Sequence, residues 1–210
     1  MKKVVVVGAG AHSKVVLDVL QGYTEYEVIG LVDINSKKRI FDIPIIGDDL
    51  ILPELYAKGI RYGFVAIGNN KVREKLQNSM EQMGYEMLTL VSRYAVVSRY
   101  ADVAAGTILM PGAVVNTCAR IGKGCILNTN CSVDHDCVIE DFCHIAPGCA
   151  ISGTTTVGSG TLLGTGAKVI DGISIGRGCV IGAGAAVVSD IPENCLAMGV
   201  PAKVKKRYAL

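Results

Sequence analysis

The sequence predicts two domains of different architecture. Residues 1–90 form a small doubly wound, Rossmann-like βαβαβ domain, and residues 91–210 form a parallel β-helix with a short C-terminal tail. Two observations carry this prediction. In the first part, short apolar runs that suit buried strands alternate with stretches of helical spacing. In the second part, aliphatic residues recur every six positions, a period that fits neither an α-helix nor a flat strand.

The N-terminal elements alternate between strands and helices along the chain. We expect strands over 2–10, 26–33, 62–70 and 85–91, and helices over 11–23, part of 48–59 and 70–84. The first helix, for example, shows Val15, Val16, Val19 and Leu20 at helical spacing before Gly22. In a sheet of this order, ligands bind beyond the carboxyl ends of the parallel strands.

The six-residue period holds without exception over sixteen positions from 97 to 187. These positions are Val97, Val103, Leu109, Val115, Ile121, Leu127, Val133, Ile139, Ile145, Ile151, Val157, Leu163, Val169, Ile175, Ile181 and Val187. In a parallel β-helix, each six-residue unit makes one flat side and stacks on its neighbours to bury its aliphatic side chain. Three units make one turn, so the repeats predict about five coils.

Six of the eight cysteines fall in one register of this repeat, four positions after an aliphatic residue. They are Cys125, Cys131, Cys137, Cys143, Cys149 and Cys179, and apart from Ile173 the other members of the register are Ala or Thr. A cysteine at such a position behaves as a small buried residue. Successive units lie on different sides of the coil, so we do not expect these thiols to converge on one metal ion. Cys118 and Cys195 lie outside the register.

Bulk properties exclude several classes of partner. A net charge of +2, with no basic run before the C-terminus, argues against a nucleic-acid partner. No apolar stretch approaches the roughly 20 residues that a membrane span needs. We interpret the chain as cytoplasmic, where thiols stay reduced, so the cysteines need an explanation other than disulfides.

His135 is the main candidate for chemistry in the repeats. It stands two positions after Val133, so its side chain should point away from the core, and it is flanked by Asp134 and Asp136. An exposed imidazole held by a carboxylate is the arrangement that a general base needs, because the carboxylate fixes the tautomer and stabilises the imidazolium. On residue types alone, a solvated surface histidine beside two solvated aspartates explains the pattern equally well.

The whole chain resembles a family of hexapeptide-repeat acyltransferases that act on nucleotide sugars. The matching segments are "VVGAGAHSKVV", "AIGNNKVR", "NTNCSVDHDCVI", "CHIAPGCAISG" and "GVPAKVKK". The family includes bacterial UDP-bacillosamine N-acetyltransferases, perosamine N-acetyltransferases and proteins called sialic acid O-acetyltransferases. The resemblance implies a left-handed coil, acetyl-CoA as co-substrate with no metal, and a homotrimer with active sites between adjacent β-helices.

The resemblance also implies roles for individual residues of the β-helix. His135 matches the base that deprotonates the sugar amine, and Asp136 matches the acid that orients it, although family members often carry Glu at 134 and 136. The other matches are Asn128 and His144 at the acetyl-CoA and sugar site, Gly153 as the N–H that stabilises the thioester oxyanion, and Thr165 and Ala183 along the pantetheine groove. Lys203, Lys205, Lys206 and Arg207 lie either near the cofactor phosphates or in an exposed C-terminal helix.

The glycine-rich start "GAGAHS" suits a nucleotide pyrophosphate. Gly8 and Gly10 expose backbone N–H groups at a helix N-terminus, but Ser13 stands where the dinucleotide fingerprint has its third glycine, which makes NAD binding weakly supported. The family's nucleotide-sugar-binding members have a histidine like His12 at this turn. We expect Asp33 to take the ribose or uracil edge. Gly68, Asn69 and Arg73 should face the phosphates. For Gly8 and Gly10, the alternative explanation is turn geometry alone.

The leading hypothesis is an acetyl-CoA-dependent N-acetyltransferase acting on the amino group of a nucleotide-linked deoxyamino sugar, with UDP favoured by resemblance alone. Transfer would be direct, with His135 as general base. Four alternatives stay open: a sugar O-acetyltransferase of the sialic acid type, a zinc-dependent carbonic-anhydrase-like β-helix, an NAD-binding oxidoreductase module and a purely structural solenoid.

Overall fold

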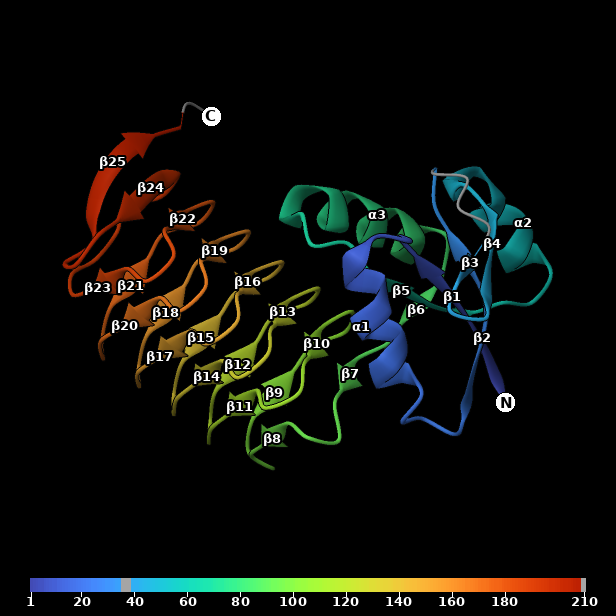
Figure 1. Cartoon of the computed structure of the whole chain (residues 1–210), viewed down its shortest axis with the longest axis horizontal. Helices are drawn as coiled ribbons and strands as arrows, with labels where there is room; N and C mark the ends of the chain where they lie inside the picture. The colour runs from blue at the N-terminus through green and yellow to red at the C-terminus, as the bar shows by residue number, and fades with distance from the viewer. Residues whose placement is uncertain (35–38, 209–210) are drawn as a thin grey trace. The chain divides into compact units, whose positions relative to one another are not determined.

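The computed structural model describes residues 1–34 and 39–208. The chain divides into two compact units, Met1–Leu90 and Val91–Leu210 (Figure 1). Each unit has its own core.

The N-terminal unit is built on a mostly parallel sheet. Its strands lie in the order β3 (Arg39–Ile40), β4 (Ile43–Gly47), β2 (Tyr26–Val32), β1 (Lys2–Val7), β5 (Tyr62–Val65) and β6 (Glu86–Met87). The central strand β1 pairs in parallel with β2 on one side and β5 on the other. The chain therefore reverses its direction of winding between β1 and β5, which is where an open α/β sheet binds its ligand. The antiparallel β3–β4 pair was not among the expected elements.

Three α-helices and one 3₁₀ turn complete the described part of this unit: α1 (Ala11–Leu20), η1 (Asp49–Ile51), α2 (Leu52–Ala57) and α3 (Asn70–Gln82). Helix α1 is shorter than expected and ends at Leu20. Its N-cap, Gly10, provides no side-chain hydrogen bond, so the first N–H groups of α1 depend on other partners. Helix α3 is capped by Asn69, whose Oδ1 accepts from Val72 N–H at 3.1 Å.

The second unit is a three-sided parallel β-helix (Figure 1). The first face holds β7 (Leu90–Val91), β10 (Ile108–Leu109), β13 (Ile126–Leu127), β16 (His144–Ile145), β19 (Leu162–Leu163), β22 (Val180–Ile181), β24 (Cys195–Met198) and β25 (Lys203–Arg207). The second face holds β8 (Val96–Val97), β11 (Val114–Val115), β14 (Ser132–Val133), β17 (Ala150–Ile151), β20 (Lys168–Val169) and β23 (Ala186–Val187). The third face holds β9 (Asp102–Val103), β12 (Arg120–Ile121), β15 (Val138–Ile139), β18 (Thr156–Val157) and β21 (Ser174–Ile175).

The interior of the β-helix follows the six-residue period. Every aliphatic position from 97 to 187 is the second residue of a two-residue strand, and all but Val97 and Val103 are at most 3% exposed. The small residues four positions later are also internal. Most Cys and Thr side chains in this register donate to the carbonyl fifteen residues ahead, for example Cys143 Sγ to Gly158 O at 3.2 Å and Thr161 Oγ1 to Gly176 O at 2.9 Å. The register therefore selects small residues, several of which also supply an internal hydrogen-bond donor.

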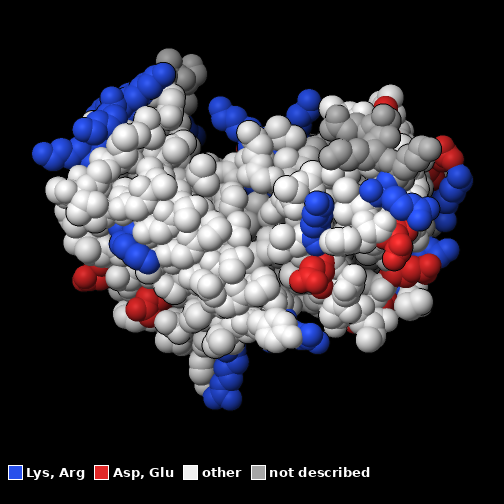
Figure 2. Space-filling model, in the orientation of Figure 1, with Lys and Arg blue, Asp and Glu red and all other residues white. Residues whose placement is uncertain are grey.

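The chain leaves the β-helix through an antiparallel pair. Strand β25 pairs with β24, and all five of its residues are exposed, so Lys203, Lys205, Lys206 and Arg207 project from a strand. The alternative of a C-terminal helix is wrong, because the tail completes the edge of the first face. Lys and Arg gather over β25 in Figure 2. Among the residues described, no helix is both long and apolar enough to cross a bilayer.

Candidate active site

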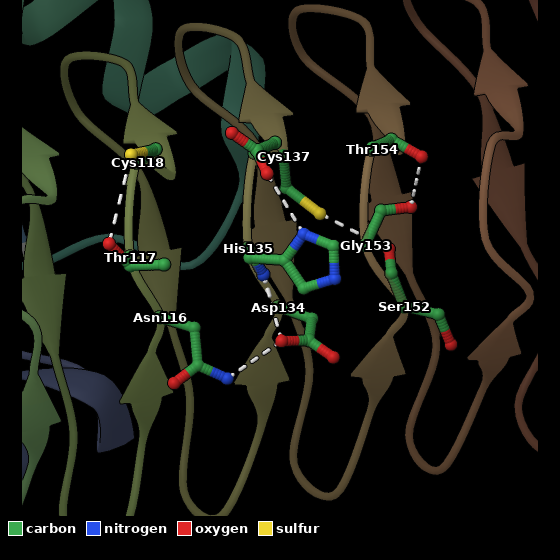
Figure 3. A network of polar contacts seen from close by, with 10 residues as sticks. Asn116, Thr117, Cys118, Asp134, His135, Cys137, Ser152, Gly153 and Thr154 are labelled. Carbon is green, nitrogen blue, oxygen red and sulfur yellow. Dashed lines mark hydrogen bonds and ion pairs between the residues drawn. The ribbon is translucent and has the colours of Figure 1, made fainter.

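His135 lies at the turn that follows β14, between the second and third faces of the β-helix (Figure 3). We call the stacked turns 116–119, 134–137 and 152–155 the His135 corner. The His135 side chain is 52% exposed, and its Nδ1 lies 2.9 Å from Asp136 Oδ2. The hydrogen bond with Asp136 raises the pKa of His135 above its ordinary value of 6.5, and the charge of Asp134 adds to this. The ring therefore points outward and carries an oriented tautomer, with its proton on Nδ1 and Nε2 free to accept.

The two neighbouring aspartates make different contacts. Asp136 has a left-handed backbone, with φ of 58°, and contacts the imidazole ring. Asp134 makes no hydrogen bond with the ring. Its Oδ1 accepts from the His135 main-chain N–H at 2.8 Å and from the Asn116 side-chain Nδ2 at 2.8 Å. These two hydrogen bonds lower the pKa of Asp134. Asp136 is therefore the acid that orients the ring.

Gly153 supports the opposite side of the His135 ring (Figure 3). A Cβ at this position would lie 2.5 Å from His135 Cε1 and 2.6 Å from Nε2, closer than real Cβ contacts. Only glycine therefore leaves room for the ring here. Among the described residues, no protein group accepts the Gly153 N–H, which stays available to a ligand beside the imidazole.

Asn128 and His144 form a second polar pair. Asn128 Oδ1 accepts from Thr129 N–H at 2.8 Å, which leaves Nδ2 to donate to His144 Nε2 at 3.1 Å. The amide therefore orients the half-buried His144 ring with Nε2 as acceptor. Asn128 lies at the turn between the first and second faces. We call the stacked turns 128–131, 146–149, 164–167 and 182–185 the Asn128 corner.

Thr165 and Ala183 are exposed at the same corner, one coil apart. The turns stack closely, with Gly184 N–H donating to Thr165 O at 2.8 Å. Gly166 and Gly184 have positive φ and open space where a Cβ would stand. This edge of small side chains and exposed main chain fits a long, narrow ligand such as a pantetheine arm.

The two corners lie at opposite edges of the second face. Within one chain, the structure thus brings His135 together with Asp136 and Gly153, and Asn128 together with His144. It places the His135 group and the Asn128 group at different corners of the β-helix.

Cys137, the thiol in the same turn as His135, is buried and is not set up as a nucleophile. Cys137 Sγ donates to Ser152 O at 3.2 Å, and burial raises the pKa of its thiol, which disfavours a nucleophilic thiolate. All eight cysteines are free thiols, and only Cys118 is exposed. Across residues 1–34 and 39–208, no three His, Cys, Asp or Glu side chains gather in a way that could hold a metal ion.

The N-terminal unit has a cleft of about 830 Å³ at the carboxyl ends of β1, β2 and β5. It is lined by sixteen residues, among them the five expected positions Gly8, Gly10, His12, Asp33 and Gly68. The turn after β1 is held by Asp33, whose Oδ2 accepts from Ala9 N–H at 2.6 Å. Gly8 has φ of 107°, and a Cβ would lie 2.8 Å from Ala66 O, so this turn requires glycine.

The residue that replaces the third glycine of the fingerprint closes the same turn. Ser13 is fully buried, and its hydroxyl donates to Gly10 O at 2.7 Å. His12 lines the cleft, and burial together with the nearby charge of Arg73 lowers its pKa to about 4. Its Nε2 is buried and has no hydrogen-bond partner among the described residues. His12 is therefore neutral near pH 7 and offers a hydrogen bond rather than a positive charge.

Two expected cleft residues support the turn from behind. Arg73 is 1% exposed, and its guanidinium donates to Ile67 O at 3.0 Å and Gly68 O at 3.2 Å. These carbonyls hold Arg73 inside and it does not line the cleft, so its contact with the phosphates stays a prediction. Asn69 likewise caps α3 and does not line the cleft.

Sequence reasoning missed three polar residues of these sites. Lys71 and Lys75, one turn apart on α3, line the cleft and supply the positive charge that Arg73 does not. Their spacing of four residues was a usable signal, since it places both on one helix face. Asn116 was also missed, although it stands eighteen residues, one full coil, before Asp134.

Comparisons with known proteins agree with both units. The profile of the PglD N-terminal domain matches residues 3–80, and that of the bacterial transferase hexapeptide (six repeats) matches residues 154–188. A search of curated proteins gives no match.

Solved structures match over nearly the whole chain. PerB from Caulobacter crescentus, in complex with CoA and GDP-perosamine, is 39% identical with a TM-score of 0.93, covering 97% of each chain. The acetyltransferase domain of PglB from Neisseria gonorrhoeae, in complex with acetyl coenzyme A, is 35% identical with a TM-score of 0.93, covering 97% of this chain and 98% of that one. WeeI from Acinetobacter baumannii is 25% identical with a TM-score of 0.85, covering 96% and 98%.

The fold and these matches thus define a hexapeptide-repeat transferase with a left-handed β-helix. The chain belongs to the family of nucleotide-sugar acetyltransferases that combine a PglD-type N-terminal domain with a left-handed β-helix. It is an acetyltransferase that uses acetyl-CoA, as the hypothesis from the sequence held.

Proposed function

We propose that the chain transfers the acetyl group of acetyl-CoA to the amino group of a sugar linked to a nucleoside diphosphate. The observation that carries this proposal is the outward imidazole of His135, held by Asp136 and supported by Gly153. It is supported by the similar PerB, which was solved with CoA and GDP-perosamine. UDP remains our expected nucleotide by resemblance, and the PerB complex makes GDP the alternative to test.

In the proposed reaction, His135 Nε2 removes a proton from the sugar amine as the nitrogen attacks the thioester carbon. A C–N bond forms, the tetrahedral oxyanion collapses, the C–S bond breaks, and the CoA thiolate leaves and takes up a proton. Asp136 stabilises the imidazolium through Nδ1. The free Gly153 N–H is our candidate donor to the oxyanion, and a donor of this kind stabilises the transition state by about 2.7–4 kcal/mol.

Acetyl transfer should be direct, without an acetyl-enzyme intermediate. Cys137, in the same turn as His135, is buried with a raised pKa and donates to Ser152 O, and the exposed Cys118 Sγ lies 3.7 Å from Thr117 Oγ1. We infer that the cleft of the N-terminal unit holds the nucleotide, with the N-terminus of α1 and the side chains of Lys71 and Lys75 toward the phosphates.

We also propose a homotrimer in which each active site combines two chains. Within one chain, Asn128 and His135 lie at opposite edges of the second face. A three-fold ring can set the Asn128 corner of one copy beside the His135 corner of the next, because a heterologous contact with closed rotation joins two different surfaces. Acetyl-CoA would then lie along Thr165 and Ala183 while its thioester meets the neighbouring imidazole.

A panel of UDP-, GDP-, dTDP- and CMP-linked amino sugars, incubated with acetyl-CoA and followed by free thiol release, tests the acceptor. We expect turnover with one nucleoside diphosphate amino sugar and N-acetyl product by NMR. Turnover only with hydroxyl acceptors would overturn N-acetylation.

Mixing His135→Ala and Asn128→Ala chains tests the shared site. Each variant alone should be weakly active, and refolded mixtures should regain activity through sites with two native corners. If mixed trimers gain no activity, His135 and Asn128 act within a site formed by one chain.

A further inference from the structure

A second set of contacts at the His135 corner acts on the His135 main chain rather than on its ring. Asp134 Oδ1 accepts two hydrogen bonds at once, from His135 N–H at 2.8 Å and from Asn116 Nδ2 at 2.8 Å (Figure 3). Asn116 and Asp134 occupy the same register of successive coils, each directly after a strand of the second face. The carboxylate therefore ties the turn of one coil to the side chain of the previous coil.

The remaining main-chain groups of this turn are held by regular contacts between coils. Asp136 N–H donates to Thr117 O at 3.1 Å, and His135 O accepts from Thr154 N–H at 2.9 Å. The Asp134 carboxylate is thus the one anchor of the His135 peptide that depends on a side chain. Asn116 is itself fixed, because its N–H donates to Val133 O at 2.9 Å.

The direction of the ring follows from the orientation of this peptide. Asp136 holds Nδ1 on one side, and Gly153 leaves less than a Cβ of space on the other. With both sides of the ring limited, a rotation of the His135 main chain would move Nε2 away from its reacting position. A misplacement of about 1 Å in such a group can cost about 100-fold in rate.

We propose that Asn116 and Asp134 form a positioning pair that sets the main-chain orientation of His135, a role separate from the ring contact of Asp136. This inference rests on the proposed function of His135 as general base. The two hydrogen bonds that Asp134 accepts lower the pKa of its carboxyl, so it stays ionised where His135 titrates. Asn128 makes one of the same two contacts, since its Oδ1 accepts from the main-chain N–H of the next residue, Thr129.

The test compares Asn116→Ala, Asp134→Ala and Asp134→Asn with a matched control. Asp141→Ala is that control, because Asp141 Oδ1 also accepts from a main-chain N–H, here that of Lys123 in the previous coil at 2.9 Å, but at a different corner. We expect Asn116→Ala and Asp134→Ala to lower kcat by about 10- to 100-fold, with KM for both substrates within about twofold. Asp134→Asn should restore most of kcat, because its amide oxygen still accepts. Asp141→Ala should keep the native kcat.

Spectroscopy of the imidazole separates positioning from a loss of stability. The chain has only three histidines, so ¹⁵N-histidine labelling resolves His135. We expect Asn116→Ala and Asp134→Ala to change the Nδ1 and Nε2 shifts of His135 at a temperature where circular dichroism shows folded protein.

Three results would overturn the inference. They are native kcat in Asn116→Ala and Asp134→Ala, a loss in Asp141→Ala as large as theirs, or equal losses in Asp134→Ala and Asp134→Asn. His135→Ala distinguishes this failure from that of the proposed function. If His135→Ala turns over normally, the base assignment fails and the pair has nothing to position. If His135→Ala is inactive while the pair variants are native, only the positioning pair is wrong.

Discussion

The His135 corner and the N-terminal cleft are built in opposite ways. At the His135 corner, residues from three successive coils meet because they share a register, eighteen residues apart. In the cleft, Gly8, Asp33 and Gly68 follow β1, β2 and β5, and β5 lies beside β1 although three strands separate the two in sequence. A repeat therefore lets the sequence place a site directly, whereas an open sheet places it only after its strand order is known.

The two sites also use glycine differently. Gly153 has an ordinary backbone, and its lack of a side chain makes room for another residue's ring. Gly8 combines a positive φ with a close approach to Ala66 O, so it shapes the turn itself. Substitution should therefore affect catalysis at the first site and stability at the second.

The largest effect among these comparisons is expected for Gly153→Ala. The new Cβ would overlap the His135 ring, so we expect kcat to fall by at least about 100-fold while the melting temperature changes little. A double-mutant cycle checks the cause. In a His135→Ala background, Gly153→Ala should lower kcat by a much smaller factor. An equally large fall in kcat there would mean that Gly153 does not act through His135.

Asp136→Asn should change both the rate and its pH dependence. The neutral form of His135 is the base, so kcat/KM rises with pH through the His135 pKa. Asp134 and Asp136 are the charged groups that raise this pKa, and the Asp136 contact is the larger cause. Without the Asp136 carboxylate the pKa falls toward 6.5, so the rising limb should move to lower pH while the plateau drops about 10-fold. A limb that stays in place would show that Asp136 does not set the His135 titration.

Gly8→Ala and Gly10→Ala contrast the cleft with the His135 corner. Gly8→Ala forces a side chain into positive φ against Ala66 O, and should cost at least about 1–2 kcal/mol of unfolding free energy. Gly10 has φ of −83° and open space around it, so Gly10→Ala should keep the melting temperature and weaken nucleotide binding instead. Thermal unfolding and titration calorimetry measure the two effects. Equal melting temperatures for the two variants would contradict this distinction.

The smallest effect is expected inside the β-helix, at Cys143. Cys143→Ala removes the thiol that donates to Gly158 O and leaves a small void, at a cost of about 1 kcal/mol, with kcat unchanged. Cys143→Ser keeps a donor and serves as the control. A large loss of kcat in either variant would show that the internal thiols matter to the reaction.

The regularity of each unit determined how much the sequence could predict. Every aliphatic position from Val97 to Val187 lies in a strand, and six of the seven buried cysteines lie in the small-residue register, because the period ties each position to its face. The outward direction of His135 follows from the same count. The closeness of Gly153 to the His135 ring and the Asn116–Asp134 hydrogen bond depend on stacking one coil onto the next, which a spacing of two residues does not show.

The N-terminal unit was less predictable because its contacts are long-range. The β3–β4 pair has only two residues in its first strand, too short to give a pattern. We expected Arg73 at the phosphates because it follows the third expected strand together with Gly68 and Asn69. Its position on α3 instead turns it toward the carbonyls of Ile67 and Gly68. Lys71 and Lys75 lie on the face of α3 that lines the cleft, and the sequence alone did not show which face that is.

The most direct test of the account is the turnover number of His135→Ala, with acetyl-CoA and the nucleotide-linked amino sugar that the native enzyme accepts. We predict that kcat falls by about 10²–10⁴, the usual contribution of a general base, while acetyl-CoA binding and the fold are retained. Near-native turnover by this variant would contradict the assignment of His135 as the base.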